Sequence, residues 1–253
     1  MVDTGRLEEI RKYIEKNEQV EVAEISKLFQ ISITTARRDL DQLAEDGEIE
    51  RVHGGAILSK KPPEPPVRLR RNEQAEEKLC IAKAAAALIK DGETILLAGG
   101  TTVCEVAKQI IHRKDLTVIT NSLLVIEALS NSRDIHLVTL GGFFRQSEKL
   151  SYGHMTEEAL NEIYADKVFT GVRAISLERG LTNDYLPELS TDRLIFRKGK
   201  EIILVADYTK FNCESTSLIG PLSIIHKIVT DDKTPPGTVE AIRGMGIEVI
   251  IAT

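Results

Sequence analysis

The sequence is poor in the features that would indicate a disulfide framework, a metal site or a membrane span. Only three cysteines occur, Cys80, Cys104 and Cys213, and they form neither a Cys-x-x-Cys motif nor a disulfide spacing. The five histidines are equally scattered. No apolar run approaches the roughly 20 residues that span a bilayer, and the charged N-terminal segment lacks a signal-peptide core. We therefore expect a cytoplasmic protein with reduced thiols, no metal, no cofactor and no membrane partner.

The chain also lacks a surplus of positive charge. Its formal net charge is −6, and residues 1–60 carry nine Lys and Arg against thirteen Asp and Glu. Binding to nucleic-acid phosphates needs a local excess of Lys and Arg. The overall charge thus argues mildly against a nucleic-acid partner, unless the cations gather on one face.

A proline cluster divides the chain. Four of the eight prolines fall within KKPPEPPVRLRR, residues 60–71, where no regular helix or ladder is expected to persist. A hydrophobic content of 42% and a length of 253 residues suit two globular domains. We predict a small domain over residues 1–58, a stiff basic linker over 59–73 and a larger domain over 74–253.

The larger domain alternates apolar runs of strand length with helical patterns. Continuous apolar strands separated by helices predict an α/β fold, with a mostly parallel sheet covered by helices on both faces. Ligands of such sheets bind at the carboxyl ends of the strands. The expected strands are Thr94–Ala98, Leu116–Thr120, Ile135–Leu140, Lys167–Val172, Glu201–Asp207, Lys227–Asp231 and Ile247–Ala252.

The small domain is expected to hold three short helices and a hairpin. Apolar residues recur at helical spacing, and the predicted inward residues are Leu7, Ile10, Tyr13 and Ile14, then Val22, Ile25, Leu28 and Phe29, then Ile33, Ala36, Leu40 and Leu43. Ser32 is placed to cap the third helix. Its outer residues, Thr34, Thr35, Arg37 and Arg38, suit a helix laid in the major groove of DNA. A solvated charged face is the alternative.

A turn, a short strand and the glycine pair Gly54-Gly55 follow, which completes a winged helix-turn-helix pattern. The segment SITTARRDLDQLAEDGEIERVHGGA resembles the signature of the DeoR family of transcriptional regulators. The chain departs from the commonest family pattern at Ala36. We expect Asp39 to orient an arginine, because a carboxylate beside phosphate is repelled unless it is paired. The residues expected at double-stranded operator DNA are Ser32, Thr34, Thr35, Arg37, Arg38, Arg51, His53 and Gly54.

The resemblance extends through the larger domain, which is similar to the DeoR sensor domain, related in fold to ribose-5-phosphate isomerase and CoA-transferases. Glycines, hydroxyls and helix amides after successive strands suit an anionic phosphate. Each such loop alone is more often an ordinary tight turn. The expected effector residues are Gly99, Gly100, Thr101, Thr102, Thr120, Asn121, Ser122, Gly141, Gly142, Arg145, Arg173 and Lys210.

Two departures from the family bear on chemistry. Ala98-Gly99 stands where many relatives have Asp-Ser, and Gly171-Val172-Arg173 stands where relatives and the isomerases commonly show Gly-Ala-Asp. Moving protons between sugar carbons needs a positioned base, so we predict no isomerase activity and no catalytic residues. Glu105, Asp184 and Glu188 remain carboxylates that could lie nearby. Arg173 would favour an acidic ligand if it faces the pocket, and is otherwise a surface residue.

These observations predict a repressor of a carbohydrate-catabolism operon, retuned at its operator by a phosphorylated sugar or a sugar acid. Such a repressor would work as a dimer or tetramer, because paired winged helices read paired half-sites. Two other classes stay open: a sugar-phosphate isomerase or acyl-CoA-type transferase, and a binding module that acts through protein partners. The residues give neither the identity of the effector nor the sign of its effect.

Overall fold

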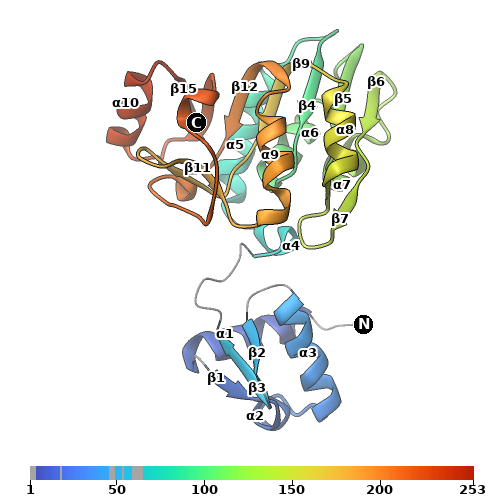
Figure 1. Cartoon of the computed structure of the whole chain (residues 1–253), viewed down its shortest axis with the longest axis vertical. Helices are drawn as coiled ribbons and strands as arrows, with labels where there is room; N and C mark the ends of the chain where they lie inside the picture. The colour runs from blue at the N-terminus through green and yellow to red at the C-terminus, as the bar shows by residue number, and fades with distance from the viewer. Residues whose placement is uncertain (1–3, 18, 46–48, 53, 59–64) are drawn as a thin grey trace. The chain divides into compact units, whose positions relative to one another are not determined.

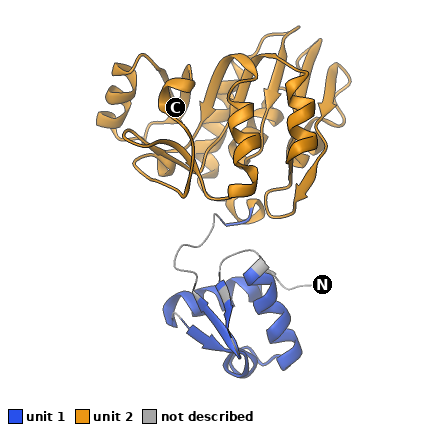
Figure 2. Ribbon diagram, viewed as in Figure 1, with its two compact units in different colours: residues 1–66 blue, residues 67–253 orange. Residues whose placement is uncertain are grey.

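The computed structural model of the chain describes residues 4–17, 19–45, 49–52, 54–58 and 65–253. Contacts between residues divide the chain into two compact units, Met1–Pro66 and Val67–Thr253 (Figure 2). His53, one of the residues expected at DNA, lies outside the described residues. No described helix is long and apolar enough to cross a membrane.

The N-terminal unit packs three helices against a small antiparallel sheet (Figure 1). The helices are α1 (Thr4–Asn17), α2 (Val22–Leu28) and α3 (Ile33–Glu45), and the strands are β1 (Gln19–Glu21), β2 (Ile49–Val52) and β3 (Gly55–Leu58). The sheet order is β1-β3-β2. The three helices and the β2–β3 hairpin confirm the expected winged helix-turn-helix, and β1 is an addition that its three residues were too few to reveal.

The core of this unit contains most of the residues that the helical spacing selected, including Ile10, Ile25 and Leu40, which are fully buried. Two expected core residues, Leu28 and Ile33, are each 50% exposed. Two others, Tyr13 and Phe29, are half-buried against the core. Leu28 is the last residue of α2 and Ile33 the first of α3. Both lie beyond the full turns whose apolar stripe meets the core, so the periodicity selected them wrongly.

The second unit is built on a seven-stranded parallel sheet in the order β15-β14-β12-β9-β4-β5-β6. Each of the seven predicted apolar runs forms one of its strands, which confirms the predicted fold class. The strands are β4 (Thr94–Leu97), β5 (Leu116–Thr120), β6 (Ile135–Thr139), β9 (Ala165–Thr170), β12 (Gly199–Val205), β14 (Lys227–Asp231) and β15 (Glu248–Ala252).

Helices cover both faces of this sheet. Successive residues of each strand point to opposite sides, so apolar residues on both sides need a helix layer to bury them. In β4, Ile95 and Leu97 belong to one buried cluster, whereas Leu96 belongs to the other. The first cluster includes α5 (Ala75–Ala86), α6 (Thr101–Gln109) and α7 (Leu123–Leu129); the second includes α8 (His154–Asn161), α9 (Leu189–Ile195) and α10 (Pro236–Gly244). In Figure 1, α8 and α9 lie in front of the sheet and α5 and α6 behind it.

The strand order reverses between β4 and β9. From β4 the chain proceeds outward through β5 to β6, and from β9 it proceeds the other way through β12, β14 and β15. At such a reversal the connecting loops diverge and leave a crevice outside the carboxyl ends of the strands. In this chain, the position where ligands of such sheets usually bind is at the ends of β4 and β9.

Several short elements escaped the sequence pattern because they are too short for a period to show. They are a sheet of β10 (Ala174–Ser176), β11 (Gly180–Asn183) and β13 (Ser217–Gly220), a hairpin of β7 (Phe143–Arg145) and β8 (Leu150–Tyr152), and the 3-10 turns η1 (Leu186–Glu188), η2 (Tyr208–Lys210) and η3 (Leu222–Ile224).

The end of the expected linker is part of the second unit. Val67–Arg70 form a short helix, α4, in place of extended chain. Val67 is buried against Cys104 and Leu124, and its backbone N–H donates to the carbonyl of Ser147 at 2.9 Å. Burial of one apolar side chain and this hydrogen bond fold the segment onto the second unit immediately after the last proline of the cluster.

Candidate functional sites

The third helix begins with a hydroxyl cap. Ser32 accepts a hydrogen bond from the backbone N–H of Thr35 at 3.1 Å, and the two hydroxyl oxygens lie 2.9 Å apart. The predicted N-cap is therefore confirmed, since this contact satisfies an amide of the first turn. Thr34 is exposed and Thr35 is half-buried beside the cap. The cap thus fixes the start of the helix that carries the two arginines.

Arg37 and Arg38 both lie exposed on α3. Among the described residues neither guanidinium has an ion pair or hydrogen bond. Asp39, between them and the core, is fully buried, and Arg6 of α1 donates to its carboxylate at 2.8 Å. The expectation that Asp39 orients an arginine is confirmed, with Arg6 as the partner. Because the neighbouring carboxylate of Asp39 is already paired with Arg6, Arg37 and Arg38 give α3 a local positive face in an acidic domain.

Arg51 braces the wing against α3. Its guanidinium lies 2.9 Å from a carboxylate oxygen of Asp41 and donates to the carbonyl of Gly55 at 2.7 Å. Gly54, at the tip, is exposed with a φ of +81°, a conformation that glycine adopts at little cost. Arg51 therefore has a structural role in the wing, in addition to any contact with DNA.

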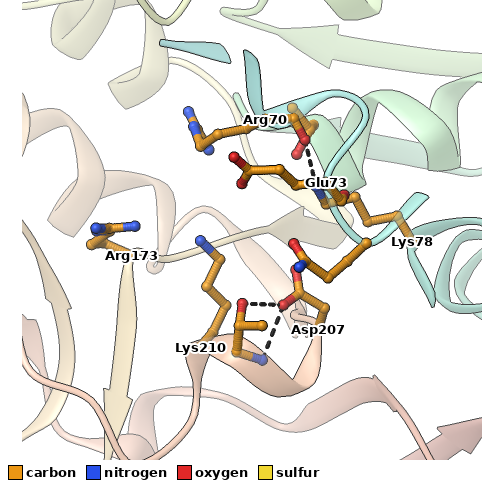
Figure 3. Close-up of a pocket in the computed structure, with 9 residues that line it drawn as sticks. Arg70, Glu73, Lys78, Arg173, Asp207 and Lys210 are labelled. Carbon is orange, nitrogen blue, oxygen red and sulfur yellow. Dashed lines mark hydrogen bonds between the residues drawn. The ribbon is translucent and has the colours of Figure 1, made fainter. Parts of the chain in front are cut away.

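The second unit contains a cavity of about 190 Å³ at the predicted edge of the sheet (Figure 3). Thr101 follows β4, Arg173 follows β9, and Lys210 follows β12, so the cavity opens where the strand order reverses. Its lining residues are Arg70, Glu73, Gln74, Lys78, Thr101, Arg173, Asp207, Thr209 and Lys210. A small crevice lined by several polar groups and lying at a switch point is a typical ligand site of this kind of sheet.

Positive charge predominates in the lining, with four cationic side chains against two carboxylates. One carboxylate, Asp207, is buried and accepts a hydrogen bond from the backbone N–H of Thr209 at 3.1 Å, as well as one from the Thr209 hydroxyl. Lys78 is also buried, and its pKa is lowered by that burial. Figure 3 shows Arg173 and Lys210 on the side of the cavity opposite Lys78. The cavity therefore suits an anionic ligand.

Three of the predicted effector residues, Thr101, Arg173 and Lys210, line this cavity. Gly99, Gly100 and Thr102 adjoin Thr101 in the loop and the first turn of α6. Gly100 has a φ of +123°, which a residue with a side chain rarely adopts, and it ends the loop so that the helix N-terminus starts at Thr101. This loop therefore supplies a hydroxyl and a helix N-terminus beside the cations.

The second predicted loop, Thr120 to Ser122, does not line the cavity. The Asn121 amide donates to the carbonyl of Ser151 at 2.8 Å, and Ser122 forms a β-bridge with Leu150. Residues 120–122 are buried beneath β8. The loop follows its strand as predicted, but the β7–β8 hairpin, which the sequence did not reveal, covers it.

The third predicted loop is also engaged elsewhere. The Thr156 hydroxyl donates to the carbonyl of Gly141 at 2.8 Å. A Cβ on Gly142 would lie 2.2 Å from that hydroxyl oxygen, so the glycine at 142 permits close packing of α8. Arg145 lies 3.0 Å from Glu188 and stacks over the ring of Tyr185 at 4.0 Å. The hairpin carries Arg145 into this cluster rather than into the cavity lining.

Buried carboxyl groups surround that arginine. Burial raises the pKa of Glu188 to about 8, although the Arg145 guanidinium acts to lower it. Burial likewise raises the pKa of Asp192 to about 6, against a hydrogen bond from Asn183. Nearby, Arg70 of the cavity pairs with Glu148. The cavity wall and this carboxyl cluster are thus joined through charged side chains.

Six lining residues were absent from the expected effector set: Arg70, Glu73, Gln74, Lys78, Asp207 and Thr209. For Asp207 and Thr209 the signal was present, because they adjoin Lys210 at the end of a predicted strand. For Arg70, Glu73, Gln74 and Lys78 the sequence offered only a polar stretch after the prolines, which does not by itself predict a place in the cavity. Glu105, Asp184 and Glu188 do not line the cavity; Asp184 lies 3.9 Å from Arg173.

Two family models match this chain. The DeoR-like helix-turn-helix domain matches residues 6–61, and the DeoR C terminal sensor domain matches residues 73–232. The HTH-type transcriptional repressor GlcR of Bacillus subtilis is 32% identical, over 99% of this chain and 97% of its own. The transcriptional repressor AccR of Agrobacterium fabrum is 33% identical, over 84% and 83%.

Among solved structures, ribose 5-phosphate isomerase A from Methanocaldococcus jannaschii is 21% identical over 55% of each chain, with a TM-score of 0.41. At that level the likeness describes neither ligand nor chemistry. The family models and the curated relatives cover both units in the same order. The chain therefore belongs to the DeoR family of transcriptional regulators.

Proposed function

We propose that this protein is a repressor that binds double-stranded operator DNA through α3 and the wing, and whose DNA affinity changes when a phosphorylated sugar or sugar acid occupies the cavity of the second unit. The observation that carries the proposal is the cation-rich cavity at the reversal of the strand order, in a chain whose other unit is a winged helix. A ligand of this class would report on the supply of a carbohydrate, so the regulated operon is one for carbohydrate use.

The DNA half of the proposal is supported by the exposed arginine pair. With Asp39 paired to Arg6, the charge of Arg37 and Arg38 is not neutralised within α3. Residues near the start of a recognition helix reach base edges and phosphates. A dimer or tetramer would place two such helices on paired half-sites, which we propose as the working form.

The effector half is supported by the composition of the lining. Arg173 lines the cavity, which favours the hypothesis of an acidic ligand over a simple surface position. Cations and a helix N-terminus hold an anion such as phosphate, and the two carboxylates and Gln74 suit hydroxyl groups. A sugar phosphate and a phosphorylated sugar acid both present that combination.

An enzyme of the isomerase class is the second candidate. Its base would have to come from the cavity, where the two carboxylates are Glu73 and Asp207. Asp207 already accepts hydrogen bonds from Thr209, and Glu73 stands on an exposed turn. Neither follows β4 or β9, where Ala98 and Arg173 occupy the positions that would carry a base. The regulators among the relatives also favour the repressor.

The test is fluorescence anisotropy with DNA from the promoter upstream of the gene, at two salt concentrations, with and without a panel of aldose phosphates, ketose phosphates and 6-phosphogluconate. We expect specific binding that weakens with salt and shifts with one compound. Arg37→Ala and Arg38→Ala should each weaken binding and reduce the slope of log affinity against log salt by about 1.

The matched control is Arg179→Ala, which removes an exposed arginine from the second unit. It should leave both the affinity and the slope unchanged. Binding no stronger than to random DNA would refute the repressor. Turnover of a panel compound, in the absence of any specific DNA binding, would favour the enzyme.

A further inference from the structure

One stretch of chain supplies more of the cavity than any strand end does. Arg70, Glu73, Gln74 and Lys78 come from the end of α4, the turn that follows it and the start of α5. By comparison, the end of β12 supplies three residues, and the ends of β4 and β9 supply one each. We call residues 70–74 the specificity wall.

A buried lysine holds the backbone of this wall. The Lys78 ammonium donates to the carbonyl of Arg70 at 2.7 Å and to the carbonyl of Glu73 at 2.6 Å. The Lys78 backbone N–H donates to the carbonyl of Gln74 at 2.9 Å. Lys78 thus ties two carbonyls of the wall together, and the side chains of Glu73 and Gln74 stand on a fixed backbone, as a recognition site needs.

Gln74 adopts a backbone conformation that favours glycine. Its φ is 46° and its ψ is 42°, the left-handed region, which costs a residue with a side chain about 1 kcal/mol or more. A glycine there would relieve that cost. Among the described residues, no group hydrogen-bonds to the Gln74 amide or to the Glu73 carboxylate. Both residues line the cavity, and neither side chain has a hydrogen-bond partner in that part of the chain.

We infer that Glu73 and Gln74 recognise the hydroxyl groups of the ligand, while the cationic residues of the cavity hold its anion. A carboxylate repels phosphate but accepts hydrogen bonds from hydroxyls, and an amide both donates and accepts. None of the described residues that line the cavity is aromatic, so no ring there would stack on a nucleotide base. The ligand class is a polyhydroxylated phosphate, distinguished from inorganic phosphate by the specificity wall. The inference rests on the proposed function.

The experiment compares two ligands by isothermal titration calorimetry with the full-length protein. One probe is inorganic phosphate, and the other is the member of the sugar-phosphate panel that raises the melting temperature most. The variants are Gln74→Gly, which removes the amide and suits the left-handed backbone, and Glu73→Gln, which removes the charge. Glu76→Gln is the matched control, because Glu76 is exposed on the first turn of α5 and does not line the cavity.

We expect each variant to weaken sugar-phosphate binding by about two- to tenfold, the effect of one hydrogen bond to the ligand. Binding of inorganic phosphate should be unchanged in Gln74→Gly and unchanged or stronger in Glu73→Gln. The control should alter neither. The melting temperature of ligand-free Gln74→Gly should equal or exceed that of the parent protein.

Three results would overturn the inference. If the ratio of the two affinities is unchanged in both variants, the specificity wall does not read hydroxyls, while the proposed function stands. A lower melting temperature for ligand-free Gln74→Gly would assign its amide to the fold instead of the ligand. If no phosphorylated compound binds the parent protein, the proposed effector class fails, and this inference fails with it.

Discussion

The buried carboxyl of Glu188 should make the second unit less stable as the pH rises. Burial raises the pKa of Glu188 from 4.5 to about 8 in the folded protein. The unfolded chain therefore loses this proton near pH 4.5, whereas the folded chain keeps it until about pH 8. The contribution of Glu188 to the free energy of unfolding is therefore fully present below pH 4.5 and is lost between pH 4.5 and about pH 8. A pKa difference of about 3.5 corresponds to an upper limit of about 4.8 kcal/mol.

Glu188→Gln removes the titration and keeps an oxygen that accepts from Arg145. Relative to the parent protein, this variant should gain about 1.4 kcal/mol in the free energy of unfolding for each pH unit between pH 5 and pH 8. Urea denaturation followed by tyrosine fluorescence measures that difference in the second unit, which contains four of the five tyrosines.

Asp192→Asn is the matched comparison for this window. The pKa of Asp192 is raised from 3.8 to about 6, so its difference from the parent should grow only between those two pH values and stay constant above them. A stability difference for Glu188→Gln that does not change from pH 5 to pH 8 would refute the reasoning. It would mean that the pairing with Arg145 outweighs desolvation.

Four further substitutions test the packing around the two sites. Asp39→Ala leaves Arg6 without its buried partner and should destabilise the N-terminal unit by about 2 to 3 kcal/mol, measured by hydrogen exchange of α1 and α3 amides. Gly55→Ala puts a Cβ 2.1 Å from the carbonyl oxygen of Val20 and should lower the melting temperature of the same unit, whereas Gly54→Ala meets no atom and should cost about 1 kcal/mol. Lys78→Met leaves two carbonyls of the specificity wall without a donor. The free energy of unfolding of the second unit, measured by urea denaturation, should fall by about 2 kcal/mol. An unchanged value would mean that water hydrogen-bonds to those carbonyls instead.

The parallel sheet could be predicted because most of its strands contain a short continuous run of apolar residues. A strand buried on both faces needs apolar residues at every position, as in Ile202 to Val205, and that pattern is visible without any contact information. Strands such as β7 and β8 have three residues each, and none of these residues is buried. Their pairing depends on what they cover, which a local pattern does not encode.

The site was predicted where it depends on local geometry and missed where it depends on packing. Gly100 and Thr101 follow a strand and open a helix, so their place at the cavity follows from the chain itself. Arg145 also follows a predicted strand, but the hairpin diverts it to Glu188. Arg70 reaches the cavity because Val67 is buried against α6 and α7, a contact between residues more than thirty positions apart.

The position of α4 determines where two regulators of this family should be joined to make a chimera. The sensor domain match begins at residue 73, which would suggest a junction there. In such a chimera Arg70 would come from one parent and Gln74 from the other. A junction before Val67 transfers the whole cavity lining. Chimeras joined before Val67 should have the ligand preference of the parent that supplies the second unit. Chimeras joined at residue 73 should have a cavity lined by residues of both parents.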